Sequence, residues 1–267
     1  MSPGGTRAAV ATIARIPYLN SEPFYALWAD APGTTVDLPP RALGEAARAG
    51  LADAGLMAAA DWFTLDPMFE RVGNLGITCR GAVDSVLLFA RRPFEELDGA
   101  TVDLTEHSQT SVALTRILLA QRYGLRDVHY RRRAVESGAP PTGDAWLLIG
   151  DAALAARRAG PGAHVLDLGQ AWLAWTGLPF VYAVWAVRAA LPLEERARLA
   201  AFLEASLAAG EADLPGIAAR YAAHAPGLGD AAFLARYLAA FRYRLGPDEE
   251  RGLDRFRALW KEHCLDA

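Results

Sequence analysis

Short apolar runs alternate with helical patterns along the first 187 residues, and this alternation constrains the fold more than any other feature. Several runs are apolar throughout, as strands buried on both faces are. Strands that alternate with helices in this way predict an α/β protein. The expected strands cover 10–16, 34–38, 54–57, 76–79, 83–90, 100–104, 128–131, 145–149, 164–166 and 180–187, with helices at 24–28, 41–49, 108–123, 150–158 and 169–175.

The last quarter of the chain carries helical patterns only. No Gly/Ser-rich linker divides the alternating part. We expect the chain to leave one lobe near 89–91 and to return near 180–182, through two strand-like stretches that form a hinge. This predicts a first lobe of residues 1–89 and 182–267, which includes the C-terminal helices, and a second lobe of residues 90–181. The expected C-terminal helices cover 193–209, 215–223, 231–244 and 249–264.

Composition and charge exclude several classes of protein. Apolar residues make up 52% of the 267 residues, which is enough for a large core and argues against a disordered or fibrous chain. The net charge is −4, with 27 basic and 31 acidic side chains, so we expect no nucleic-acid partner. Lys261 is the only lysine, which excludes Schiff-base chemistry in the body of the chain.

Neither a targeting segment nor a membrane span is expected. The apolar run 8–14, between Arg7 and Arg15, is too short for a secretory signal and fits a first strand better. No stretch approaches the roughly 20 apolar residues needed to cross a bilayer. We therefore expect a cytoplasmic protein with no membrane partner.

The sequence lacks metal and nucleotide motifs. Cys79 and Cys264 are far apart, and the five histidines have no metal-ligand spacing. Neither GxGxxG nor GxxxxGK[ST] occurs, which argues against dinucleotide and P-loop nucleotide binding. We expect neither a metal nor a cofactor.

Polar residues gather at turns where an expected strand leads into a helix. A helix start offers backbone N–H groups and a positive dipole end to an anion. The strongest such signal is the cluster of hydroxyl side chains at 105–111, which includes Thr110 and Ser111. Asn20 lies in a similar turn, and its amide both donates and accepts hydrogen bonds. Ordinary helix capping explains both turns equally well.

Three further segments carry weaker signals. Ser85 is a polar residue in the apolar run 83–90, and Asp151 follows Gly150 at the start of an expected helix. Trp172 follows the turn at 167–169, where its ring either lines a pocket or packs in the core. The alternative interpretations are that Ser85 is a small hydrogen-bonded residue within a strand, that Asp151 caps a helix, and that Trp172 packs in the core.

Several blocks of sequence can then be read together, in order along the chain. They are IPYLNSEP at 16–23, RGAVDSVLLF at 80–89, LDGATV with TSVAL at 97–102 and 110–114, GDAAL at 150–154, and DLGQAW with GLPFV at 167–172 and 177–181. In this order they resemble the chorismate dehydratase family of menaquinone biosynthesis by the futalosine route. The resemblance covers about residues 11–260, nearly the whole chain.

The resemblance implies a fold and a reaction. The implied fold is that of type II periplasmic binding proteins, with two α/β lobes, a two-strand hinge and a ligand cleft between the lobes. The implied reaction is a carbon–oxygen lyase (hydro-lyase) step without a cofactor, in which chorismate loses water to give 3-[(1-carboxyvinyl)oxy]benzoate. The proton leaves the ring carbon that bears the enolpyruvyl ether, and the neighbouring hydroxyl departs.

The resemblance also directs attention to particular residues. We expect Asn20 to orient the ring or the leaving hydroxyl, and Asp151 to be a second catalytic candidate. No motif offers a carboxylate–histidine pair as the base, so we expect the substrate's own enolpyruvyl carboxylate to take the proton, with Asp151, Glu106 and His107 as rivals. The expected substrate-binding residues are Tyr18, Ser85, Val86, Thr110, Ser111, Gly150 and Trp172.

Two other functions remain open at this stage. One is the later pathway enzyme that acts on cyclic dehypoxanthine futalosine, which would require a histidine base in the cleft. The other is a non-catalytic protein that binds small carboxylates, because a fold alone does not determine function. Asp84 does not suit the expected anion site, since it places a carboxylate beside Ser85. If Asp84 points into the cleft, the role of Ser85 is weakened.

Overall fold

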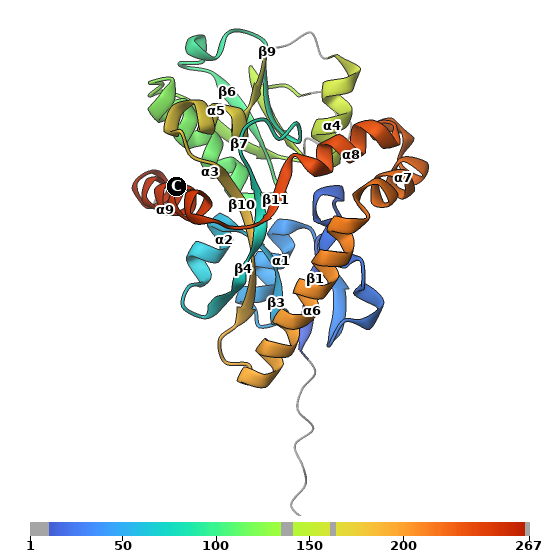
Figure 1. Cartoon of the computed structure of the whole chain (residues 1–267). Helices are drawn as coiled ribbons and strands as arrows, with labels where there is room; N and C mark the ends of the chain where they lie inside the picture. The colour runs from blue at the N-terminus through green and yellow to red at the C-terminus, as the bar shows by residue number, and fades with distance from the viewer. Residues whose placement is uncertain (1–10, 135–140, 161–163, 265–267) are drawn as a thin grey trace, which may run out of the picture.

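The computed structural model describes residues 11–134, 141–160 and 164–264. Residues 1–10 therefore lie outside the described part, and with them Val10, the first residue of the first expected strand. The described chain forms two β-sheets, one above the other in Figure 1, with helices packed around them.

The first sheet has six strands and the second has five. Reading across the first sheet, the order is β11 (Phe241–Arg244), β4 (Phe69–Cys79), β10 (Phe180–Arg188), β3 (Ala54–Ala58), β1 (Thr12–Arg15) and β2 (Thr34–Asp37). The second sheet has the order β7 (His129–Arg133), β6 (Thr101–Thr105), β8 (Ala145–Ile149), β5 (Val86–Ala90) and β9 (His164–Asp167).

The helices lie on both sheets and between them. The α-helices are α1 (Pro40–Arg48), α2 (Ala59–Leu65), α3 (Gln109–Ile117), α4 (Gly150–Ala159), α5 (Leu168–Thr176), α6 (Leu193–Ala212), α7 (Leu214–His224), α8 (Ala231–Ala239) and α9 (Pro247–His263). Short 3₁₀ segments are η1 (Leu19–Tyr25), η2 (Trp28–Asp30), η3 (Phe94–Glu96) and η6 (Pro226–Leu228), and the π-helical η4 (Leu118–Arg122) extends α3.

The expected α/β fold is confirmed, and the burial of the strands explains why the apolar runs predicted it. β3, β5 and β8 are buried at every position. Both faces of these strands are therefore apolar, and their sequences do not alternate between polar and apolar residues. β1 pairs in parallel with β2 and β3, and β6 pairs in parallel with β7 and β8. β5 and β10 run antiparallel to their neighbours, so both sheets are mixed.

The chain passes between the sheets twice. It leaves the first sheet at the end of β4 and enters the second at β5, so the first passage lies at 80–85, a few residues before the expected position. It returns between α5 and β10, at 177–179. β4 and β10 are neighbours in the first sheet, so the first passage begins, and the second ends, at adjacent strands.

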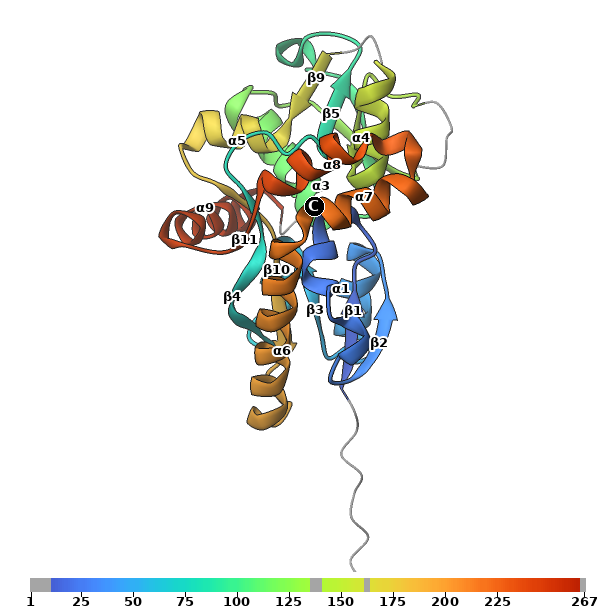
Figure 2. The same cartoon turned by 45° about the vertical axis from the view of Figure 1, so that its right-hand side comes forward.

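The division into lobes at 1–89, 90–181 and 182–267 stays a proposal. α6 packs against η1, and α9 packs against α2, α3 and β10. α7 and α8 lie between the two halves in Figure 2, and η6, which joins them, contacts α4. The C-terminal helices therefore contact elements of both sheets.

Several expectations for local structure were wrong. The helix expected over 24–28 is replaced by two 3₁₀ segments, η1 and η2. The helix expected over 231–244 ends at Ala239, and β11 follows it at the edge of the first sheet. Phe241 and Tyr243 are buried while Arg242 is exposed, which is the two-residue period of a strand. The strand expected at 76–79 is the end of the much longer β4. Its first half was missed because exposed Gly73 and Asn74 interrupt the apolar pattern, although pairing with β10 extends over it.

Gly210 tests how closely α6 packs on η1. A β-carbon at this position would lie 2.1 Å from the carbonyl oxygen of Pro23. Alanine is favoured over glycine in an exposed helix by about 1 kcal/mol, but here we expect Gly210→Ala to lower the free energy of unfolding by about 1–3 kcal/mol because of the clash. Urea denaturation measures this change. A more stable Gly210→Ala protein would contradict the packing, and Ala208→Gly, at an exposed position of the same helix, reports the effect of propensity alone.

Asp61 predicts a pH dependence of stability. Burial raises the pKa of its carboxyl from 3.8 to about 6, against the opposing effect of Arg48. The folded protein therefore holds this proton more tightly, so the contribution of Asp61 is most favourable at low pH and is lost as the pH rises from about 4 to about 6. Two pKa units correspond to about 3 kcal/mol. As the pH rises over this range, the free energy of unfolding of the parent should therefore fall relative to that of Asp61→Asn, by up to about that amount. A constant difference in urea denaturation at each pH would contradict it.

Candidate active site

A cavity lies between the two sheets. Elements of both sheets line it: η1, β3, β4 and β10 from one side, and β5, β8, α3 and α4 from the other. Seven of the nine expected site residues meet here, although they are far apart in sequence. They are Tyr18, Asn20, Ser85, Val86, Thr110, Ser111 and Gly150.

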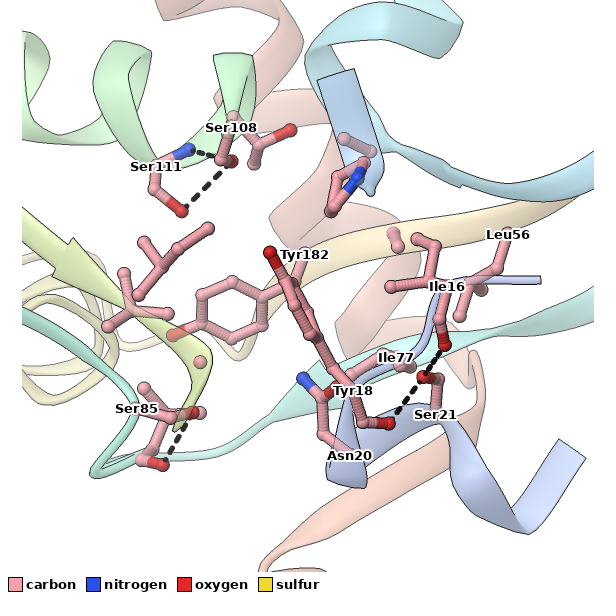
Figure 3. Close-up of a pocket in the computed structure, with 18 of the residues that line it drawn as sticks. Ile16, Tyr18, Asn20, Ser21, Leu56, Ile77, Ser85, Ser108, Ser111 and Tyr182 are labelled. Carbon is pink, nitrogen blue, oxygen red and sulfur yellow. Dashed lines mark hydrogen bonds between the residues drawn. The ribbon is translucent and has the colours of Figure 1, made fainter. Parts of the chain in front are cut away.

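Asn20 lies on η1 and lines the cavity. Ser21 donates its hydroxyl to the carbonyl oxygens of Ile16 and Tyr18, at 2.8 and 2.7 Å. This tightens the turn into a 3₁₀ segment whose N-cap position is Tyr18. Among the described residues the Asn20 amide has no hydrogen-bond partner, and Figure 3 shows it beside the two tyrosines of the cavity. The amide is therefore available to a ligand.

Tyr18 brings the two sides of the cavity into contact. Its ring lies against Gly150, where a β-carbon would stand 3.6 Å from Cδ2 and Cε2 of Tyr18. Gly150 has a φ of 57°, in the left-handed region that favours glycine, at the point where β8 turns into α4. Glycine thus allows both the turn and the flat contact with the ring.

The start of α3 presents hydroxyl groups to the cavity. Ser108 is the N-cap, and its Oγ accepts a hydrogen bond from the backbone N–H of Ser111 and donates to Oγ of Ser111, both at 3.1 Å (Figure 3). The proton of the Ser111 hydroxyl remains available to donate. Capping and anion binding, the two interpretations of this cluster, are therefore compatible, because Ser108 caps while Ser111 faces the cavity.

Thr110 links α3 to the first sheet. Its Oγ1 accepts a hydrogen bond of 2.9 Å from the backbone N–H of Ala60, in α2. A second link joins the same regions, where the N–H of Arg41 donates to the carbonyl of His107 at 3.2 Å. These contacts hold the start of α3 against the opposite side of the cavity.

Ser85 is held by a tyrosine that the sequence did not single out. The hydroxyl of Tyr237, on α8, donates to Oγ of Ser85 at 2.9 Å, and Ser85 donates to the carbonyl of Val83 at 3.3 Å. The second bond is long for a hydroxyl donor, so its proton is easily redirected to a ligand. Asp84 does not line the cavity and pairs with Arg157 at 3.2 Å, which removes the conflict with Ser85.

Neutral groups line the cavity. Within the described chain, its lining includes no Asp, Glu, Lys, Arg or His. The polar groups are the Asn20 amide, serine, threonine and tyrosine hydroxyls, and the N-terminal end of α3. Hydroxyl and amide donors beside a helix N-terminus suit a carboxylate, because they supply hydrogen bonds and a positive dipole end without a competing charge.

Asp151 and Trp172 are not among the residues that line this cavity. Asp151, next to Gly150, accepts a hydrogen bond of 2.7 Å from the hydroxyl of Tyr221 on α7, and burial raises the pKa of its carboxyl. Trp172 is fully buried and donates its indole N–H to the carbonyl of Pro179 at 3.2 Å. Trp172 therefore packs in the core, and its role in substrate binding stays a prediction.

Tyr182, in β10, is a lining residue that the sequence analysis missed. Its hydroxyl is buried without a hydrogen-bond partner among the described residues, and burial raises its pKa well above the ordinary value. A β-carbon at Gly169 would lie 2.6 Å from this hydroxyl, so a glycine there gives it room. The run 180–187 predicted a strand, but an apolar run carries no sign of which residue faces a ligand.

Comparison with known proteins identifies the family. The model of a family described as menaquinone biosynthesis matches residues 11–262. The chain belongs to this family. A chorismate dehydratase from Thermus thermophilus is 33% identical over 199 residues, which is 68% of this chain and 70% of that protein. The family recognised from the five sequence blocks is thus confirmed.

Solved structures confirm the fold of this family member. A crystal structure of a protein from Archaeoglobus fulgidus matches with a TM-score of 0.77 and 16% identity, over 94% of this chain and 96% of that chain. The periplasmic aliphatic sulphonate-binding protein of Escherichia coli matches with a TM-score of 0.65 and 18% identity, over 94% and 86%. At these identities the likeness shows a periplasmic-binding-protein-like fold and nothing of function.

Metal and membrane features were also sought in the described ranges. There, no group of three or more His, Cys, Asp or Glu side chains is arranged to hold a metal ion. None of the helices in the same ranges has the length and apolar character required to span a bilayer.

Trp172→Ala separates a core role from a binding role. Loss of this buried indole should lower the free energy of unfolding by about 3–5 kcal/mol, because Trp172 packs against Phe180 and Phe256. Chemical denaturation measures the loss, and the less buried Trp175 is the matched control. A stable Trp172→Ala protein with impaired ligand binding would instead support the substrate-binding role.

Proposed function

We propose that this protein is a chorismate dehydratase, which converts chorismate to 3-[(1-carboxyvinyl)oxy]benzoate with loss of water and without a cofactor. The observation that carries the proposal is a cavity between the sheets where neutral donors converge from Asn20, Thr110 and Ser111. The name of the Thermus thermophilus relative supports the same reaction. As a biosynthetic enzyme of a small molecule, the protein would act in the cytoplasm.

The donors fit a substrate with two carboxylates. One carboxylate would lie at the start of α3, where the Ser111 hydroxyl has a proton to donate and Thr110 lines the cavity. The other would lie near Ser85 and Val86, where the long bond from Ser85 to Val83 can be exchanged for one to the ligand. Asn20, with no competing partner among the described residues, would then orient the ring or its hydroxyl.

The lining favours a substrate-assisted proton transfer. None of the rival bases, Asp151, Glu106 and His107, lies among the described residues that line the cavity, and Asp151 is already bonded to Tyr221. We propose that the enolpyruvyl carboxylate takes the proton from the ring carbon that bears the ether, as the neighbouring hydroxyl leaves. Proton and hydroxide together leave as water, and the ring becomes aromatic. Holding these groups in reactive geometry supplies up to roughly 7–11 kcal/mol.

Asn20→Ala tests this assignment. We expect turnover of chorismate to fall at least about 100-fold, because a positioned donor in a water-excluding cavity acts mainly on the transition state. Binding of chorismate, measured by calorimetry, should weaken far less. Asn74→Ala is the matched control, since the amide of Asn74 bonds to the carbonyl of Leu245 and does not line the cavity. An unchanged kcat in Asn20→Ala would exclude Asn20 from the reaction.

Absorbance distinguishes the dehydratase from the other two functions. Incubation with chorismate should remove the diene absorbance and produce that of a benzoate. Binding of chorismate without a spectral change would support a non-catalytic carboxylate-binding protein. No binding of chorismate, together with turnover of cyclic dehypoxanthine futalosine, would support the later pathway enzyme.

A further inference from the structure

A second cavity lies against another face of α3. Residues of α1, α2, α3, β7 and α9 contribute to its lining. On α3 the lining residues are Gln109, Val112, Ala113 and Arg116, which share one helix face by their spacing of three and four. Within the described chain, the two cavities have no lining residue in common. The first turn of α3 therefore separates them.

The second cavity contains a buried carboxylate with an unused oxygen. The side chain of Asp61 is 2% exposed, and its Oδ1 accepts from the guanidinium of Arg48 at 3.3 Å. Its Oδ2 is buried and has no hydrogen-bond partner in the described part of the chain. Gly44 leaves room for the carboxylate, because a β-carbon there would lie 2.7 Å from Oδ1. A buried acceptor left unpaired is costly, so this oxygen suits a donor on a ligand.

Three guanidinium groups line the same cavity, those of Arg48, Arg116 and Arg132. Only Arg48 is paired with Asp61. Arg116 lies over the ring of Tyr130, 4.8 Å from its centroid, and its Nε is buried without a hydrogen-bond partner among the described residues. No carboxylate of the described ranges forms an ion pair with Arg116 or Arg132. The positive excess suits an oxyanion, which arginine binds through its planar set of donors.

We propose that this second cavity binds a phosphate monoester, with its oxygens on Arg116 and Arg132 and its P–OH group donating to Oδ2 of Asp61. Any oxyanion satisfies the arginines, but only one that still carries a proton can also donate to a carboxylate. A phosphate monoester loses its second proton near a pH of about 6, so it keeps that proton in part at neutral pH. Sulfate has no such proton. Val112 and Trp260 supply apolar surface for the organic group.

Calorimetry with inorganic phosphate, glycerol phosphate and sulfate, at equal ionic strength, tests the proposal. At pH 7, above the pKa of about 6 of the Asp61 carboxyl, the parent protein should bind both phosphate compounds at least about tenfold more tightly than sulfate, because sulfate meets the Asp61 carboxylate without a proton between them. In Asp61→Asn the amide can donate to either oxyanion, so this preference should disappear. Arg116→Gln should weaken both phosphate compounds at least about tenfold.

Two variants serve as controls. Arg198→Gln, at an exposed position of α6, should leave phosphate affinity unchanged. Asn20→Ala should also leave it unchanged, because Asn20 lines the other cavity. Thermal unfolding shows which variants are folded, and Arg116→Gln alone decides the matter if Asp61→Asn does not fold.

Several results would overturn the proposal. They are an absence of phosphate binding to the parent protein, an equal affinity for sulfate, or a loss of binding in Asn20→Ala in place of Arg116→Gln. Glycerol phosphate binding more tightly than inorganic phosphate would support a monoester. The reverse order would replace the monoester with free phosphate.

Discussion

Antiparallel pairing between β4 and β10 is the constraint on which the rest of the structure depends. β4 carries the chain toward the second sheet and β10 brings it back, so the strands of the second sheet are inserted between two hydrogen-bonded neighbours. The same two strands contribute Ile77 and Tyr182 to the cavity between the sheets. The pairing therefore joins the two sheets and forms part of one wall of the cavity. The bond between Thr110 and Ala60 then holds α3 over the other wall.

The two cavities differ in the charge of the side chains that line them. The candidate active site lies in a protein of net charge −4 and offers an anion only amide and hydroxyl donors and the dipole of α3. Such donors hold a carboxylate without pairing it to a cation, which leaves it basic enough to accept a proton. In the second cavity, arginine side chains outnumber Asp61, and in the proposed complex the carboxylate would add selectivity. An anionic ligand that carries a proton would bind both the arginines and the Asp61 carboxylate.

Much of the candidate site was predictable, because turns between strands and helices carry a local signal. Asn20 and Ser111 lie in such turns, and α/β sheets place these turns along one edge. Tyr182 and Tyr237 were missed, since each lies in an element whose residues are mostly apolar and nothing local marks the one that faces a polar group. Trp172 shows the converse, because an aromatic residue near a turn packs equally well in a core.

The sequence by itself determined most of the order of strands and helices, the α/β class and the family, because local periodicity and short motifs lie within single segments. β11 was lost inside a helical prediction, since a four-residue strand next to a helix is defined by its pairing with β4. Only the tertiary structure decided that Asp84 points away from the cavity, that Tyr237 holds Ser85, and that Asp61 keeps a free oxygen. Each of these facts depends on residues far apart in sequence, so no local pattern encodes them.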